Sequence, residues 1–486
     1  MMGGLVDEAM TLAESEFNEV LFVYCGGVNE TCIVINPNHS KPLCHFCTKC
    51  TRKVLKQYGI KSKSLSDFAD DLENNIRFEY DSLQDIKSIE YRGIKIGLSI
   101  ASNYISTTRN MNPLMDGCAR RYFDRHLSQN VHFVDAIYHL FDSFQPDVVY
   151  SFNGRFEEVR PIFDICKLKS IHCVLAEVIK KDGNWYKVRF EDKLPHDIKY
   201  NVERRNYCWD NYNLSDDEKN ELGNSFYHKR RHGEESGDKL IYVANQIEGN
   251  YNDFDSTKIN IAIFNSSEDE FAAVGGDWES LKLFSSQYEG IVYLLKHADP
   301  SIHFYLRVHP NLKNIKYRYH TDLYDLRKEF SNITIIPANS NVSTYTIMEH
   351  CDKIVCFGST MGIEGTYWGV PSILLGPSIY YYDGVAYTPK SKEEAISLLN
   401  KKLAPLRNEN LIRIGAYILN KEPLICHTKY INCDSHDRKL FGIKYTENNF
   451  LSFRGNVSRT ALYIALRRFI FGMRIFGNAH VPLKEA

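Results

Sequence analysis

The chain has 486 residues, which is enough for two domains with hydrophobic cores of their own. Its composition is that of an ordinary globular protein, because 43% of the residues are hydrophobic, 25% are charged and only 15 are prolines. The 59 Lys and Arg residues nearly balance the 61 Asp and Glu residues, and the formal net charge is −2. This balance argues against a protein that binds nucleic acid along its whole length, although it is compatible with a local basic face.

The start of the chain, "MMGGLVDEAMTLAESEF", lacks the order of basic, apolar and small residues that is typical of a secretory signal. No run of the sequence reaches the roughly 18 apolar residues of a membrane-spanning helix. These two features predict a cytoplasmic protein. In that compartment we expect its 13 cysteines to be thiols rather than disulfides.

Five cysteines gather in the first fifty residues, and three of them are separated by two-residue gaps in "CHFCTKC". Thiolates at this spacing can point toward one soft metal ion. The other two are too loosely spaced to complete a typical zinc site, so the sequence favours reduced, partly buried thiols and no metal. The five are Cys25, Cys32, Cys44, Cys47 and Cys50.

The first half of the chain shows an α/β rhythm. An apolar strand with a glycine turn is predicted at residues 18–27, and an amphipathic helix at 130–144. A strand and turn at 146–154, a helix at 155–168 and a strand at 170–179 follow. Strand, turn, helix and strand in this order predict a parallel sheet covered by helices.

The residues from about 205 to 255 are polar, and we place a domain boundary there, so that the domains are 1–250 and 251–410, followed by a tail at 411–486. The second domain again alternates strands and helices. Its strands are continuous apolar runs, as expected when helices cover both faces of a sheet. They are predicted at 259–267, 302–310, 332–338, 353–360 and 371–376.

Four consecutive strand ends of this second domain carry small or polar residues. Ligands of doubly wound sheets bind beyond the carboxyl ends of the strands, so these groups are expected at one edge. Each group alone has a simpler explanation as a helix N-cap or a strand end, but together they predict a nucleotide site. The groups are Ser266, Ser267, Asp269 and Glu270, then Arg307, His309 and Pro310, then Ser340, and last Gly358, Ser359 and Thr360.

The chemistry of these residues suggests separate roles. Ser359 and Thr360 would hold phosphate, because the glycine before them allows close approach of the backbone. Glu364 would accept hydrogen bonds from ribose hydroxyls, the alternative being a solvated carboxylate in the first helical turn. Arg307 and His309 would neutralise a phosphate or a leaving group, with His309 changing its charge near neutral pH.

Beyond these patterns, several stretches resemble bacterial capsule polysaccharide biosynthesis glycosyltransferases across roughly residues 130 to 400. They include "SFNGRFEEVRPIFDICK", "FNSSEDEF", "LRVHPNL" and "CFGSTMGIEGTYWGVPSILLG". The resemblance implies an α/β fold of the GT-B type, with two Rossmann-like doubly wound domains facing a central cleft. The acceptor would bind the N-terminal domain and the nucleotide-sugar the C-terminal one. His309-Pro310 and Ser359-Thr360 also resemble transferases that use CMP-activated acidic sugars such as Kdo or sialic acid.

The resemblance implies transfer of a sugar from a CMP- or UDP-activated donor to a growing capsule or lipopolysaccharide. The acceptor would be a glycan or a lipid-linked glycan, and no metal or other cofactor would be required. Glu177 is the first candidate for the catalytic base, and Asp269 or Glu270 is the second. The turn at Asn153, Gly154 and Arg155 would hold the acceptor or the sugar of the donor.

Two other functions remain open. A nucleotide-sugar 2-epimerase has the same architecture, but its later Arg-Thr-Glu-Arg-type segment is replaced here by "GPSIYYYDGVAY". The third is an inactive scaffold in a polysaccharide assembly complex. The tail adds a question of location, because residues 458–477 predict an amphipathic helix. That helix would pack on the N-terminal domain or dock on anionic lipid at the inner face of the cell membrane.

Overall fold

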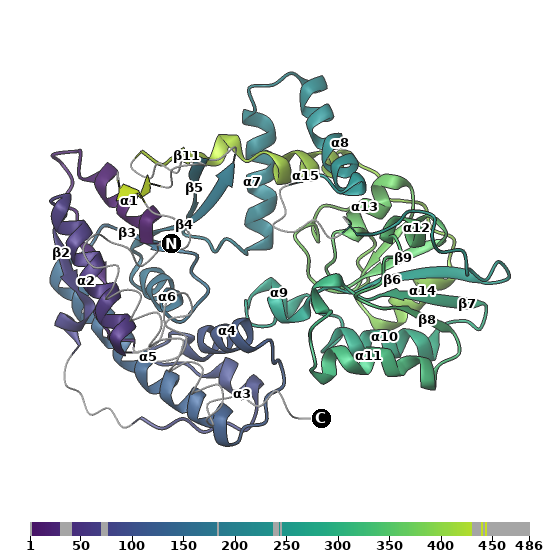
Figure 1. Ribbon diagram of the computed structural model, residues 1–486, viewed down its shortest axis with the longest axis horizontal. Coiled ribbons are helices and arrows are strands. Elements are labelled where there is room, and N and C mark those ends of the chain that lie inside the picture. Colours follow the sequence, from purple (N-terminus) through teal and green to yellow (C-terminus); the bar gives the residue numbers. More distant parts are fainter. Residues whose placement is uncertain are drawn as a thin grey trace. The chain divides into compact units, whose positions relative to one another are not determined.

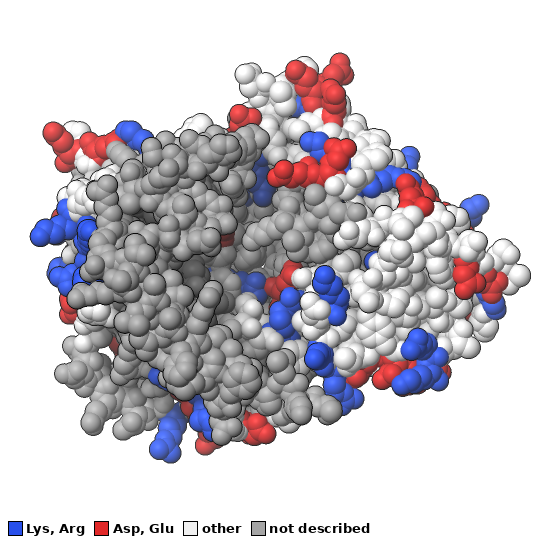
Figure 2. Space-filling model, viewed as in Figure 1, with Lys and Arg blue, Asp and Glu red and all other residues white. Residues whose placement is uncertain are grey.

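The computed structural model describes residues 2–29, 41–69, 76–181, 184–236, 243, 245–429, 439–440 and 443–444. The chain forms two compact units, which are described separately. Unit 1 comprises Met1–Thr108, Asn112–Pro195 and Ile425–Ala486, and unit 2 comprises Arg109–Met111 and His196–Leu424. On the face drawn in Figure 2, basic and acidic side chains are interspersed over the described surface.

The boundary between the units differs from the one expected near residue 250. Unit 2 begins at His196, because α7 (Ile198–Asn211) and α8 (Asp216–His232) pack against α15 (Glu409–Leu419). At the crossing of α8 and α15, a Cβ atom on Gly223 would lie 2.3 Å from the carbonyl oxygen of Ile412. The polar stretch in which the boundary was expected therefore contains a helix of unit 2, α8.

Unit 2 contains one parallel sheet of five strands in the order β10-β9-β6-β7-β8, of which β6, β7, β8 and β9 are labelled in Figure 1. This confirms the α/β interpretation of the second half of the chain, and each strand lies within the range predicted for it. The strands are β6 (Ile259–Phe264), β7 (Ile302–Arg307), β8 (Ile333–Ile336), β9 (Lys353–Cys356) and β10 (Ser372–Leu374).

Helices cover both faces of this sheet, and alternate strand residues supply two cores. Ile261 and Ile263 belong to one core, to which α10 (Gln287–His297), α11 (Arg318–Glu329) and α14 (Lys392–Asn400) contribute. Ala262 and Phe264 belong to the other, with α8, α12 (Thr344–Glu349), α13 (Met361–Trp368) and α15. The period of two explains why the strands are apolar throughout.

Unit 1 has the predicted parallel pair, β3 (Val148–Phe152) and β4 (His172–Lys181), joined by α6 (Arg160–Lys169). The described part of its sheet is nevertheless mixed rather than doubly wound. β5 (Asn184–Glu191) folds straight back along β4, and β11 (Ile425–His427) pairs antiparallel with β5. β1 (Phe22–Tyr24) and β2 (Ser62–Ser64) form a separate parallel pair.

The helices of unit 1 surround these strands. They are α1 (Met2–Leu12), α2 (Lys41–Gln57), α3 (Leu83–Ser88), α4 (Ile96–Thr108) and α5 (Gly117–Phe144), with the 3-10 turn η1 (Leu65–Phe68). Together, α4 and α5 contribute many of the buried side chains of unit 1.

The segment predicted as a single tail, 411–486, is divided between the units. The helix α15 and the turn η4 (Glu422–Leu424) belong to unit 2, whereas β11 joins the sheet of unit 1. β12 (Lys439–Leu440) and β13 (Ile443–Lys444) form a short ladder. The amphipathic helix expected at 458–477 lies outside the described residues, so its lipid contact stays a prediction. Among the described helices, none has the length and hydropathy needed to cross a bilayer.

Candidate active site

The edge of the unit 2 sheet contains a switch in strand order. From β6 the chain proceeds to β7 and β8, and then it crosses to β9 on the other side of β6. Such a reversal leaves a crevice at the carboxyl ends of the strands, where doubly wound proteins bind ligands. An open pocket lies there, lined by Ser266 after β6, Gly358 after β9 and Gly376 after β10.

The pocket combines a flat apolar wall with a polar edge. Phe271 and Trp278 stack with a centroid distance of 4.2 Å and an interplanar angle of 7°. Gln287, on α10, donates to the Ser266 hydroxyl at 2.8 Å, and its carbonyl accepts from the Ser266 N–H at 3.0 Å. A planar heterocycle that offers both an apolar face and hydrogen-bonding groups suits these walls.

Gly358 provides the close backbone approach that the sequence suggested. Its φ of 129° is one that residues with a side chain rarely adopt, and a Cβ atom there would lie 2.9 Å from the carbonyl oxygen of Pro377. The position therefore requires glycine, and the strand end stays open toward the pocket.

Polar side chains at the start of α13 belong to a hydrogen-bonded network, and the sequence predicted only some of its members. Glu364 is fully buried, and one of its oxygens accepts from Arg230 Nε at 2.9 Å and from the Thr360 hydroxyl at 3.0 Å. Its other oxygen accepts from the hydroxyl of Tyr345. Arg230 also donates to the Thr360 hydroxyl at 3.0 Å. Ser359 accepts from the N–H of Met361 at 3.3 Å.

Arg230 and Tyr345 were missed by the sequence reasoning. Arg230 comes from the last turn of α8, in the basic run "HKRRH", which lies in the polar stretch where a domain boundary was expected. The ribose role predicted for Glu364 stays a prediction, but the structure shows that both carboxylate oxygens already have protein donors.

His309 lies half-buried after β7 and is held in one tautomer. Its Nδ1 accepts from the N–H of Asn311 at 3.2 Å, so the neutral ring carries its proton on Nε2. Burial lowers the pKa of His309 to about 4, and nearby positive charges act in the same direction. These charges belong to Arg307, Arg230 and Arg109. The expected change of charge near neutral pH is therefore wrong, and His309 is a neutral hydrogen-bond donor.

We expect the His309 ring of the ligand-free protein to titrate near pH 4. An NMR titration of histidine-labelled protein measures this, with a His309→Gln variant to identify the signal. Because the ordinary pKa is about 6.5, the unfolded chain takes up the proton first as the pH falls. This group therefore lowers the free energy of unfolding progressively between about pH 6.5 and 4. A midpoint between pH 6 and 7 would contradict the assignment.

Arg307 stabilises a loop rather than pairing with a carboxylate. Among the described residues, its guanidinium donates to the backbone carbonyls of Val308, Pro337 and Ser340 at 3.1, 2.5 and 3.1 Å. Burial lowers the pKa of Arg307 to about 10, so the group stays charged at neutral pH. It therefore places a buried positive charge beside the strand ends, and Ser340 contributes its carbonyl.

The acidic turn after β6, η2 (Glu268–Glu270), has two different environments. Asp269 is buried and pairs with the Arg109 guanidinium, with one N–O distance of 3.0 Å. Glu270 is exposed and accepts from the Asn311 side chain at 2.6 Å, and the same amide donates to Ser267 at 3.0 Å. Of the two second-choice bases, only Glu270 is therefore exposed. Pro310 begins the turn η3 (Pro310–Leu312) beside them.

In unit 1, the structure brings the predicted substrate turn to the first-choice base. Asn153 follows β3 with a φ of 57°, and its amide donates to Glu177 Oε1 at 2.5 Å. Gly154 has a φ of 75°, and a Cβ atom there would lie 2.6 Å from a methyl group of Leu175. Arg155 donates to the Ser102 hydroxyl at 2.6 Å. The predicted base and the predicted substrate-binding turn therefore belong to one polar cluster of unit 1.

The cysteine cluster is only partly described. Cys25 is exposed, and Cys44 and Cys47 are half-buried. Cys32 lies outside the described residues, and so does the side chain of Cys50. In the described part of the chain, no group of three or more metal-binding side chains occurs.

Comparison with known proteins supports the resemblance over part of the chain. Residues 256–405 match the model of the family described as capsule polysaccharide biosynthesis protein. No curated protein matches the sequence.

Similar solved structures include two KpsC enzymes of Thermosulfurimonas dismutans. The β-Kdo 2,4 transferase is 14% identical, with 56% of this chain and 78% of that chain covered and a TM-score of 0.34. The β-Kdo 2,7 transferase is 12% identical, with 58% and 79% covered and a TM-score of 0.33. The UDP-GlcNAc 2-epimerase of Methanocaldococcus jannaschii is 16% identical, with 60% and 80% covered and a TM-score of 0.28.

Proposed function

Because residues 256–405 are similar to the capsule polysaccharide biosynthesis family, we propose that this chain is a glycosyltransferase. It moves a sugar from a nucleotide-sugar to a growing surface polysaccharide. The observation that carries the proposal is the pocket at the switch point of unit 2, between Ser266 and Gly358. The buried charge of Arg307 and the start of α13 lie at the same sheet edge and favour an anionic ligand.

The donor we propose is a CMP- or UDP-sugar, with its base against the wall formed by Phe271 and Trp278 and its phosphate at the start of α13. The purpose of this arrangement is to stabilise the nucleotide as it leaves. The neutral His309 ring would donate its Nε2 hydrogen to an oxygen of the leaving phosphate.

The chemical step joins an acceptor hydroxyl to the anomeric carbon of the sugar. A carboxylate takes the proton of the acceptor hydroxyl, and the hydroxyl oxygen forms the new bond to the anomeric carbon. The bond from the anomeric carbon to the phosphate oxygen breaks, and its electron pair stays on that oxygen. Glu177, with Asn153 beside it, is the proposed base, and the exposed Glu270 is the second candidate. We propose a glycan or a lipid-linked glycan as the acceptor and no additional cofactor.

The nucleotide class is tested by calorimetry of the full chain with CMP, UDP, GDP and their sugars. We expect CMP or UDP to bind in preference to GDP. Tight and selective binding of GDP would contradict this choice.

The reaction class is tested by incubating the chain with the nucleotide-sugar that binds. Release of nucleotide that depends on an added glycan acceptor supports transfer. Interconversion of two nucleotide-sugars without acceptor would identify an epimerase instead, and neither reaction with any donor and acceptor would favour a scaffold.

A further inference from the structure

The carboxylate of Glu364 is buried and forms its hydrogen bonds with side chains of this chain. It is 0% exposed, and an isolated charge there would be strongly unfavourable. The Arg230 guanidinium at 2.9 Å compensates it, and hydroxyl groups of Thr360 and Tyr345 complete its hydrogen bonds. Three protein donors surround this fully buried carboxylate, so a ribose hydroxyl has no open approach to it, and the geometry favours a positioning role for Glu364.

Arg230 has the exposure that Glu364 lacks. Its side chain is 16% exposed, against 0% for Glu364. Two of its nitrogens are fixed, because Nε donates to Glu364 and Nη2 to Thr360. The planar guanidinium is therefore held in one orientation beside the first residues of α13, which reduces the conformational entropy lost when it binds an anion.

Positive charges and an open backbone position elsewhere in unit 2 also favour an anion near the start of α13. The positive charge of Arg230 acts on His309, which lies at the end of β7, separated from β9 by β6 in the sheet. Arg307 adds a buried charge, and its acceptors among the described residues are backbone carbonyls. Gly358, two residues before Thr360, leaves room for a ligand to approach the backbone.

We propose that Arg230 binds the phosphate of the nucleotide and that Glu364 positions Arg230 instead of binding ribose. This inference rests on the proposed function, because the phosphate is that of the nucleotide-sugar donor. Guanidinium groups suit this task, since their parallel N–H groups match two oxygens of one phosphate.

The decisive experiment compares the affinities of the full chain and its variants for CMP and UDP by calorimetry. Arg230→Gln alone would leave Glu364 buried without its cation, which is strongly destabilising and can prevent folding. The double variant Arg230→Gln/Glu364→Gln removes both charges and keeps hydrogen-bonding side chains of similar size. We expect its affinity to fall by about 10- to 150-fold, as for loss of a charge-assisted hydrogen bond.

Two further variants separate the roles. Glu364→Gln alone retains Arg230, so its affinity should fall by less than about tenfold. Arg407→Gln is the matched control, because Arg407 donates to the carbonyls of Thr366 and Tyr367 at the opposite end of α13, at 3.2 and 2.7 Å. It removes the same charge and should leave nucleotide affinity unchanged. Circular dichroism and thermal unfolding check that each variant is folded.

The outcomes are distinct. A folded double variant that binds as tightly as the unmodified chain overturns the role of Arg230 and leaves the proposed function standing. A loss in Glu364→Gln as large as that of the double variant would restore the ribose role of Glu364. If the unmodified chain binds neither CMP nor UDP, the donor site of the proposed function and this inference both fail.

Discussion

Lys187→Ala is expected to lower the free energy of unfolding of unit 1 by about 3–5 kcal/mol. The Lys187 ammonium lies 2.6 Å from Asp7 Oδ2 and 2.8 Å from Glu8 Oε2, and all three side chains are at most 2% exposed. Removal of the cation leaves two carboxylates of α1 buried without it, and the remaining partner of Glu8, Arg189, is itself partly exposed. Urea denaturation measures the loss, and hydrogen exchange should show early opening of α1.

An exposed pair in the same unit provides the control. Lys61 lies 2.5 Å from Glu19, but the two side chains are 60% and 67% exposed. Water screens such a pair, so Lys61→Ala should change the free energy of unfolding by at most about 1 kcal/mol. If both substitutions lower the free energy of unfolding equally, the buried ion pairs of Lys187 are no more important for stability than the exposed Lys61–Glu19 pair.

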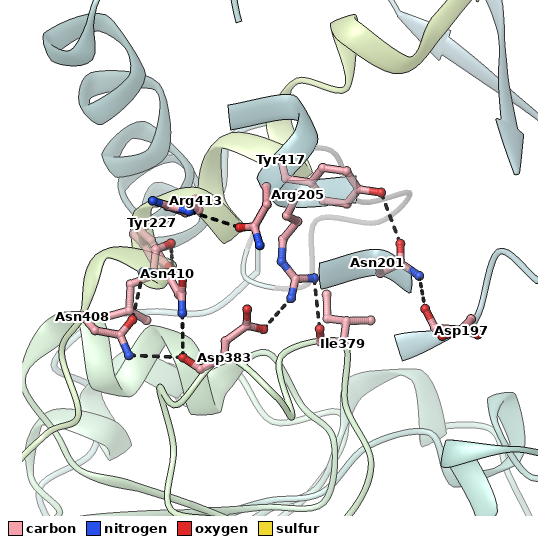
Figure 3. A network of polar contacts seen from close by, with 12 residues as sticks. Asp197, Asn201, Arg205, Tyr227, Ile379, Asp383, Asn408, Asn410, Arg413 and Tyr417 are labelled. Atoms are coloured by element: carbon pink, nitrogen blue, oxygen red, sulfur yellow. Dashed lines mark hydrogen bonds and ion pairs between the residues drawn. The ribbon is translucent and has the colours of Figure 1, made fainter. Parts of the chain in front are cut away.

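Arg205→Ala is expected to destabilise unit 2 by a similar amount, about 3–5 kcal/mol. Arg205 extends from α7 to the segment after β10, where it lies 2.5 Å from Asp383 Oδ2 and donates to the carbonyl of Ile379 at 3.1 Å (Figure 3). Both charged side chains are at most 3% exposed. The segment begins at Gly376 and Pro377, which line the pocket, so we also expect weaker nucleotide binding.

Arg413, drawn in the same view, is the matched control. It pairs with Glu409 one helical turn away at 3.1 Å, where the Glu409 side chain is 74% exposed, and it also donates to Asn206 Oδ1 at 3.2 Å. Arg413→Ala should therefore change the free energy of unfolding by less than about 1 kcal/mol. Thermal unfolding of both variants tests the difference, and similar melting temperatures would contradict the structural role given to the Arg205–Asp383 pair.

The sheet of unit 2 could be predicted from the sequence because its strands are short apolar runs that end in small or polar residues. The run ending at Phe264 and the run ending at Cys356 are both buried on two faces, and each is followed by a residue of the pocket, Ser266 or Gly358. A local pattern is sufficient to predict such strands, because burial of both faces requires apolar residues at nearly every position.

Contacts between distant segments could not be predicted in this way. Arg230 is 130 residues before Thr360 in the chain, yet the two side chains are 3.0 Å apart. Charged residues stabilise both ends of α8, with Asp216 in its first turn and Arg231 in its last. In the sequence, the same residues were interpreted as part of a polar stretch at a domain boundary. The packing of α8 on α15 brings Arg230 to the start of α13, and no local pattern in the sequence indicates this contact.

In unit 1, one local signal was present but was not used. The sequence between β4 and β5 is Asp182-Gly183, a dipeptide typical of two-residue hairpins. It indicates that the chain reverses after β4 instead of crossing over through a helix. The role proposed for Glu177 as base depends on an acceptor, and nothing in a strand end specifies which sugar hydroxyl would approach it.

The crossing of α8 and α15 decides where this protein can be cut. A fragment limited to residues 256–405 would contain the whole five-stranded sheet but neither helix. Phe226 and Tyr227 of α8 and Leu411 and Ile414 of α15 are buried against one face of that sheet, and the fragment would expose that face to water. The continuous part of unit 2, residues 196–424, retains both helices and Arg230 and is therefore the better fragment for expression, but it lacks Arg109, the partner of the buried Asp269.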